Sequence, residues 1–106
     1  MSGQVMVVPM DEMLEVVEKM DSYANISYSL LEMMFCDKKA DKFLISSLCE
    51  FHAGANRTKE TVLTTMEKEV EIPKGTKVPE DCLPMRDEDY ILVTNLLLGM
   101  MTLEVD

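Results

Sequence analysis

One histidine and three cysteines are the residues in this chain that could form a zinc site. Cys49 and His52 are separated by two residues, so a helix would place them on one side, and Cys36 and Cys82 would complete a Cys3His set. Structural zinc sites usually take their ligands as two closely spaced pairs, and the second pair is missing here. Because the cysteine number is odd and the spacing fits no disulfide framework, we favour three reduced thiols.

Four acids near the N-terminus have a spacing that could bind a magnesium ion. Asp11, Glu12, Glu15 and Glu18 are as close as the carboxylates that hold this ion in helical hydrolases. Such enzymes need a second acidic pair on a facing helix, and the sequence offers none. A solvated helix face is the favoured interpretation, because acids are common on helix surfaces.

Nucleophilic catalysis has no stronger support in the sequence. His52 has no nearby aspartate partner, and its apolar neighbours predict a hydrogen-bonded core histidine. Ser46 and Ser47 lack the glycines of a nucleophile elbow. We therefore expect a protein that is not an enzyme and has no cofactor, with a small metal-dependent enzyme as the least favoured alternative.

Charge and composition predict a single acidic domain over residues 1–106. The chain has 10 basic and 20 acidic residues, a net charge of -10 and 47% hydrophobic residues, which is typical of a folded protein and not of a disordered acidic tail. Residues 1–36 and 73–106 are acidic, whereas residues 37–72 are nearly neutral. Phosphate backbones require clustered Lys and Arg, so we expect no direct nucleic-acid binding and a partner protein with a basic surface.

Neither a leader nor a membrane helix is expected, so the predicted location is the cytoplasm. Residues 1–10 lack a basic region followed by a long apolar run. The longest uncharged stretch, residues 90–103, contains three polar residues and falls short of the roughly 20 residues that span a bilayer.

Apolar periodicity predicts an all-α fold, a small bundle of three helices over residues 10–36, 40–70 and 87–104. Residues 1–9 form an extended arm in this interpretation, and the proline-rich residues 72–86 form a crossover loop. Gly54 lies inside the second helix, where a break is the alternative, but the unbroken apolar phase favours continuity. His52 and Lys59 interrupt that helix's apolar stripe, so each needs a partner or access to water.

Two helices carry more apolar surface than a three-helix bundle can bury. Ile26, Leu30 and Met33 form a second stripe on the first helix, and Ile91 and Leu98 form one on the last. Among the 11 methionines, Met33 stands off the main stripe, where a flexible side chain suits an adaptable surface. We expect these five residues to bind a partner, most simply in a homodimer. The alternative is that the long loop and residues 5–8 fold over them.

The leading functional hypothesis is a protein-binding regulator or inhibitor. Its apolar helix surface would dock on a partner, while Asp11, Glu15 and Glu18 would face basic groups, for example those of a nucleic-acid-binding protein. The rival hypothesis is an assembly chaperone or a structural oligomeric subunit, in which the acids only maintain solubility.

Overall fold

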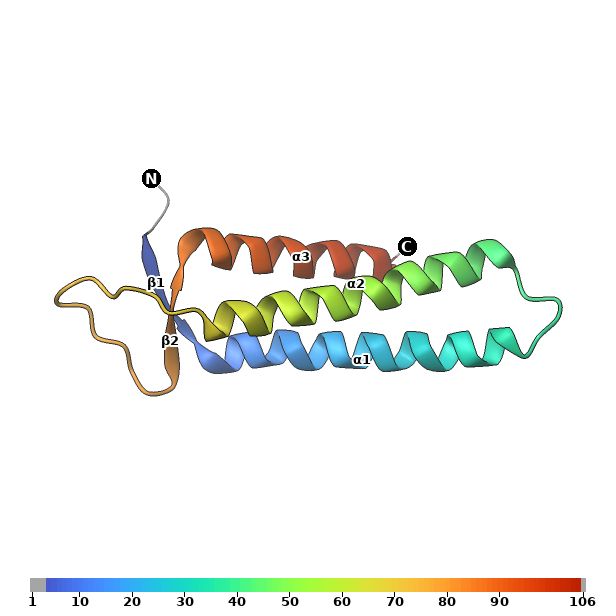
Figure 1. Ribbon diagram of the computed structural model, residues 1–106, viewed down its shortest axis with the longest axis horizontal. Helices are drawn as coiled ribbons and strands as arrows, with labels where there is room; N and C mark the ends of the chain where they lie inside the picture. The colour runs from blue at the N-terminus through green and yellow to red at the C-terminus, as the bar shows by residue number, and fades with distance from the viewer. Residues whose placement is uncertain (1–3, 106) are drawn as a thin grey trace.

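The computed structural model describes residues 4–105, with side chains described for residues 4–102. Three helices and one two-stranded ribbon follow in the order β1 (Val5–Pro9), α1 (Met10–Phe35), α2 (Lys42–Glu67), β2 (Cys82–Arg86) and α3 (Asp87–Val105). The helices lie alongside one another with the ribbon across one end (Figure 1), and the molecule measures 62 × 27 × 21 Å. The predicted helical bundle is confirmed, with a small sheet added to it.

The helix ends agree with local sequence signals. Asp11 and Glu12 lie in the first turn of α1, where the helix dipole favours acids. Asp41 caps α2 because its Oδ1 accepts a hydrogen bond from the Phe43 amide at 2.8 Å. The observed α2 is shorter than the predicted 40–70 by a few residues, a difference expected where helix ends fray.

The arm and the crossover loop are only partly irregular, and this corrects the all-α prediction. β1 lies within the predicted arm 1–9, of which residues 1–3 fall outside the described residues, and β2 forms the end of the predicted loop 72–86. The strands pair antiparallel, from Val5 opposite Arg86 to Pro9 opposite Cys82. The pairing buries Val8, Leu83 and Met85 at the end of the helix bundle. Pro84 is tolerated because each strand of a two-stranded ribbon has a free edge.

The core runs along the axis of the bundle and draws on every element. Its least exposed side chains on the helices are Met13 and Met20 of α1, Ala55 and Val62 of α2, and Val93 and Met100 of α3. The two residues on each helix are seven positions apart, which is two helical turns and keeps them on one face.

Helix α2 is continuous through Gly54, and its two inward polar side chains have partners on α1. His52 Nδ1 lies 3.1 Å from the Ala24 carbonyl oxygen and 3.0 Å from Ser27 Oγ. Lys59 Nζ donates to Asp21 Oδ1 at 2.6 Å. The predicted continuity is therefore confirmed, and both polar residues are satisfied by the neighbouring helix.

The third helix covers only part of the α1–α2 pair. Helix α3 starts beside the ribbon and has 19 residues, whereas α1 and α2 have 26 each. It runs in the same direction as α1 and ends well before the turn that joins α1 to α2 (Figure 1). We call residues 24–56 the distal hairpin; most of it extends past α3, whose Met100 reaches as far as Gly54.

Candidate protein-binding surfaces

The first candidate surface is a groove between α1 and α3, which we call the α1–α3 groove. It has a volume of about 250 Å³ and is lined by Glu12, Met13, Glu15, Val16 and Lys19 of α1 and by Val93, Thr94, Leu97 and Met101 of α3. The two helices run parallel here, so an acidic α1 edge faces a mainly apolar α3 edge along the length of the groove. An amphipathic partner with one apolar and one basic side would complement both edges.

The acidic edge contains the three acids that the sequence predicted for partner binding. Glu15 lines the groove, and Asp11 and Glu18 lie one helical turn to either side of it. All three are exposed, so their negative charges face solvent and are available to a partner.

The opposite edge displays the predicted apolar stripe of α3. Thr94 lines the groove, and Ile91 and Leu98 lie three residues before it and four residues after it, which is the same side of the helix. Ile91 is 56% exposed and Leu98 is 54% exposed. Of the eight predicted partner-binding residues, Glu15 lines the groove itself, and Asp11, Glu18, Ile91 and Leu98 lie within one helical turn of a lining residue on the same two helices.

A hydrogen bond to Glu12, one of the residues that line the groove, joins its two helices. The Tyr90 hydroxyl on α3 donates to Glu12 Oε1 on α1. This bond holds the proton on the phenol, and together with partial burial it raises the pKa of Tyr90 above the usual value for tyrosine. The Glu12 carboxylate thus has a hydrogen-bond partner within the chain, while the acids on either side of it remain exposed.

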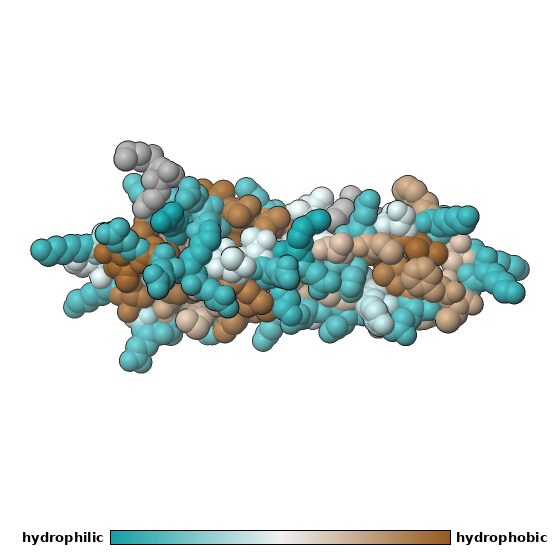
Figure 2. All heavy atoms as spheres, in the orientation of Figure 1, coloured by the Kyte–Doolittle hydropathy of each residue, from teal (hydrophilic) through white to brown (hydrophobic). Residues whose placement is uncertain are grey.

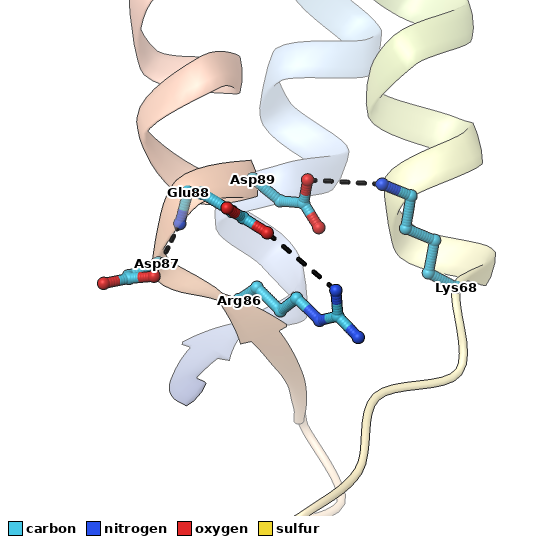
Figure 3. Close-up of polar contacts among 5 residues, drawn as sticks. All are labelled: Lys68, Arg86, Asp87, Glu88 and Asp89. Carbon is cyan, nitrogen blue, oxygen red and sulfur yellow. Dashed lines mark hydrogen bonds and ion pairs between the residues drawn. The ribbon is translucent and has the colours of Figure 1, made fainter. Parts of the chain in front are cut away.

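The beginning of α3 is held by a second set of polar contacts (Figure 3). Asp89 is buried and accepts a hydrogen bond from Nζ of Lys68, the residue that follows α2, at 3.2 Å. Asp87 Oδ1 accepts from the Glu88 amide at 2.8 Å, and Glu88 lies 3.9 Å from Arg86. The backbone joins the ribbon here, because the Asp87 amide donates to the Gln4 carbonyl at 2.8 Å. These contacts fix the start of the helix that carries Ile91 and Leu98.

The other three predicted residues lie on the distal hairpin. Ile26, Leu30 and Met33 are exposed on α1, and Figure 2 shows hydrophobic residues gathered over this end of the molecule. The alternative prediction, in which residues 5–8 and the long loop cover the two stripes, is wrong: β1 and β2 pair with each other, and all five apolar residues stay exposed.

The same end of the molecule contains a second groove, which we call the distal groove. Its apolar walls are Phe43, Leu44, Leu48 and Phe51 of α2 and Met100 of α3, and its volume is about 900 Å³. Leu44 lies in phase with the apolar residues of α2, a position that predicts burial, yet its side chain is 49% exposed. Phe43 is 79% exposed and is not among the predicted partner-binding residues; its position next to Lys42 and off the buried stripe was the available signal.

The four residues considered for zinc binding do not come together as a set: Cys49 and His52 share α2, but the other two cysteines lie elsewhere. Cys82 is on β2, Cys36 is at the end of α1, and His52 is hydrogen-bonded to Ser27 between α1 and α2. Within residues 4–102, no three His, Cys, Asp or Glu side chains are grouped as metal ligands. Burial raises the pKa of the Cys82 thiol, and neighbouring Asp81 raises it further, which disfavours the thiolate that binds metals.

Comparisons with known proteins add no further assignment. No family model, curated protein or solved structure matches the chain. None of the helices in the described part of the chain combines the length and apolar character needed to cross a bilayer. The two grooves and the charge around them are therefore the features of the molecule that bear on its function.

Proposed function

We propose that this protein is a protein-binding regulator or inhibitor, without catalytic activity of its own, that docks on a basic partner through the α1–α3 groove. The observation that carries the proposal is the pairing of exposed apolar residues on one edge, Ile91 and Leu98, with exposed acids on the other, Asp11, Glu15 and Glu18. Apolar contact supplies affinity in such an interface, and charge complementarity supplies orientation and speed of association.

The preferred partner element is an amphipathic basic helix. Such a helix would lie along the groove with its apolar face on Ile91 and Leu98 and its Lys or Arg residues beside Glu15 and Glu18. Nucleic-acid-binding proteins carry basic surfaces of this kind, and the acids on α1 would then stand in for phosphates. A net charge of -10 would favour rapid encounter with any such partner.

The test uses a defined probe, a fluorescein-labelled amphipathic peptide of leucine and lysine about 14 residues long. We expect binding by fluorescence anisotropy that weakens with salt. The double variant Glu15→Lys/Glu18→Lys should bind the peptide at least about 10-fold more weakly and with a smaller salt dependence. The reason is that two charges opposite in sign to the peptide's lysines are replaced by charges of the same sign. A peptide with glutamate in place of lysine is the control and should not bind.

The apolar edge needs a separate test. Replacing Ile91 and Leu98 by glutamine removes apolar contact without changing charge, and should weaken peptide binding by about 10-fold or more. Unchanged affinity in both the acid-reversal and the glutamine variants would exclude the α1–α3 groove as the docking site. Absence of peptide binding at low salt would contradict the proposal itself.

A second candidate function is favoured by the distal hairpin. Exposed apolar side chains on two helices, remote from the acidic groove, suit a structural subunit that builds an oligomer. That observation leads to a more specific inference.

A further inference from the structure

We infer that the distal hairpin is an interface between two copies of this chain. The two α1–α2 hairpins pack antiparallel, so that each copy covers the part of its partner that α3 leaves uncovered. This inference does not depend on the proposed binding of a basic partner, because it uses different residues at a different end of the molecule.

The helical phase of α1 shows that the surface left uncovered beyond α3 is suited to packing against another helix. Glu12, Val16 and Lys19 line the groove with α3. The same side of the helix continues through Tyr23 to Ile26, Leu30 and Met33, in alternating steps of four and three residues. That spacing maintains one stripe along a helix that packs against another. Beyond the end of α3, the stripe is apolar and exposed.

Helix α2 continues its α3-facing side in the same way. Lys68 bonds to Asp89 of α3, and Gly54 lies against Met100 of α3. Gly54 in α2 and Lys68 at its C-terminal cap are 14 apart, or two heptads. One heptad further toward the N-terminus is Ser47, which lines the distal groove with Phe43. Both helices therefore present a packing surface past the point where α3 ends.

The exposed apolar area approaches what a stable dimer needs. The exposed fractions are 59% for Ile26, 42% for Leu30, 70% for Met33, 79% for Phe43 and 49% for Leu44. Since a large side chain has roughly 200 Å² of surface, these five expose on the order of 600 Å². A standard stable interface buries about 800 Å² on each partner, and the half-buried Leu48 and Phe51 beside them supply part of the remainder.

The distribution of charge favours a second copy at this end of the molecule. Residues 24–56 contain four acids, Glu32, Asp37, Asp41 and Glu50, and three bases, Lys38, Lys39 and Lys42. Their net charge is 3 − 4 = −1, so −9 of the total −10 lies elsewhere. Two copies that overlap only through their distal hairpins keep their strongly acidic halves far apart, which limits self-repulsion.

The antiparallel arrangement also places opposite charges together. Residues 37–42 carry three lysines, Lys38, Lys39 and Lys42, and two acids, Asp37 and Asp41, so this end of the hairpin is weakly basic. In this overlap it reaches toward the acidic half of the partner. A two-fold axis makes the same contact twice, as in other isologous interfaces. The result is a central four-helix bundle of two hairpins, continued at each end by a three-helix bundle.

The test is the mass of the protein by sedimentation equilibrium over a concentration series, with two matched variants. Ile26 and Ile91 are both exposed helical isoleucines, at 59% and 56%. We expect a dimer for the wild type, a dimer for Ile91→Glu, and a dissociation constant raised by at least about 100-fold for Ile26→Glu, because a charge cannot be buried unpaired at an apolar interface.

Three outcomes would overturn the inference: a monomeric wild type up to about 100 μM, a dimer that persists in both Ile26→Glu and Phe43→Glu, or a dimer that is lost only in Ile91→Glu. Circular dichroism checks that each variant keeps the helical content of the wild type. Because all three substituted side chains are exposed in the single chain, their folding should be unaffected. Peptide binding at the α1–α3 groove should survive Ile26→Glu, which separates failure of this inference from failure of the proposed function.

Discussion

Met100 of α3 packs directly against Gly54 of α2, so closely that a Cβ at residue 54 would lie 3.1 Å from the Met100 sulfur. This contact marks the inner end of the distal groove, which both residues line. Glycine allows the close approach, at the expense of helix propensity in the middle of α2. The sulfur is at the flexible end of its side chain and borders open space, so it can move by the few tenths of an ångström that a methyl group requires.

The first prediction concerns this contact. Gly54→Ala should stabilise the fold by up to about 1 kcal/mol, because alanine is the better helix former and the Met100 side chain can move into the groove. Gly54→Leu should destabilise it, because a larger side chain would separate α2 from α3. Urea unfolding followed by circular dichroism measures both. A loss of stability in Gly54→Ala would show that Met100 is rigidly held.

The second prediction separates the core from the exposed stripe on α1. Met20 is fully buried, so Met20→Ala should lower the free energy of unfolding by roughly 2–5 kcal/mol through lost contacts and a cavity. Met33 on the same helix is 70% exposed, and Met33→Ala should cost less than about 0.5 kcal/mol when unfolding is followed at concentrations that keep the chain monomeric. Equal losses for the two variants would contradict the assignment of Met33 to the surface.

The third prediction concerns the hydrogen bond from Tyr90 to Glu12. Tyr90→Phe should cost about 1 kcal/mol near neutral pH, because Glu12 loses its partner across the groove. The raised pKa of Tyr90 means that the folded state holds the phenol proton more tightly than the unfolded state. The contribution is therefore fully present below pH 10, the ordinary tyrosine value, and is lost as pH rises through the higher folded-state pKa.

Denaturation of wild type and Tyr90→Phe at a series of pH values from 7 upward measures this difference. The two curves should converge at alkaline pH. If the difference in stability between the proteins were the same at every pH, the Tyr90 hydroxyl would not be the group responsible.

The fourth prediction compares two acids at the start of α3. Asp89 is buried and bonded to Lys68, so Asp89→Asn should cost roughly 1 kcal/mol by removing an ion pair and an acid at a helix N-terminus. Glu88 is exposed, and its distance of 3.9 Å from Arg86 is long for an ion pair. Glu88→Gln should therefore cost less than about 0.5 kcal/mol. Thermal unfolding of both variants should rank them in this order, and the reverse order would refute the role given to Asp89.

The helices could be predicted from sequence because their apolar residues repeat at the helical period over many turns. Met13, Met20 and Val62 fall on this period, and the structure buries them. The polar interruptions at His52 and Lys59 were recognised as needing partners. Their partners, Ser27 and Asp21, could not be named, because the register between two helices is not encoded in the period of either.

The ribbon could not be predicted in the same way. Its strands are five residues each, both contain a proline, and Val5 pairs with a residue 81 positions away, so neither strand carries a local signal strong enough to be distinguished from a loop. The division of the candidate site into two surfaces could not be predicted from the sequence either. It depends on where α3 ends relative to α1 and α2, which is a property of packing and not of the sequence pattern.

The shape of the protein in solution tests the central claim, a dimer joined through its distal hairpins, most directly. One chain is 62 Å long, and an overlap of about 12 helical residues and a turn shortens the combined length by about 25 Å. Small-angle X-ray scattering should therefore give a dimer mass and a maximum dimension of about 100 Å. A dimer mass with a maximum dimension near that of one chain would mean side-by-side packing, and would contradict the account.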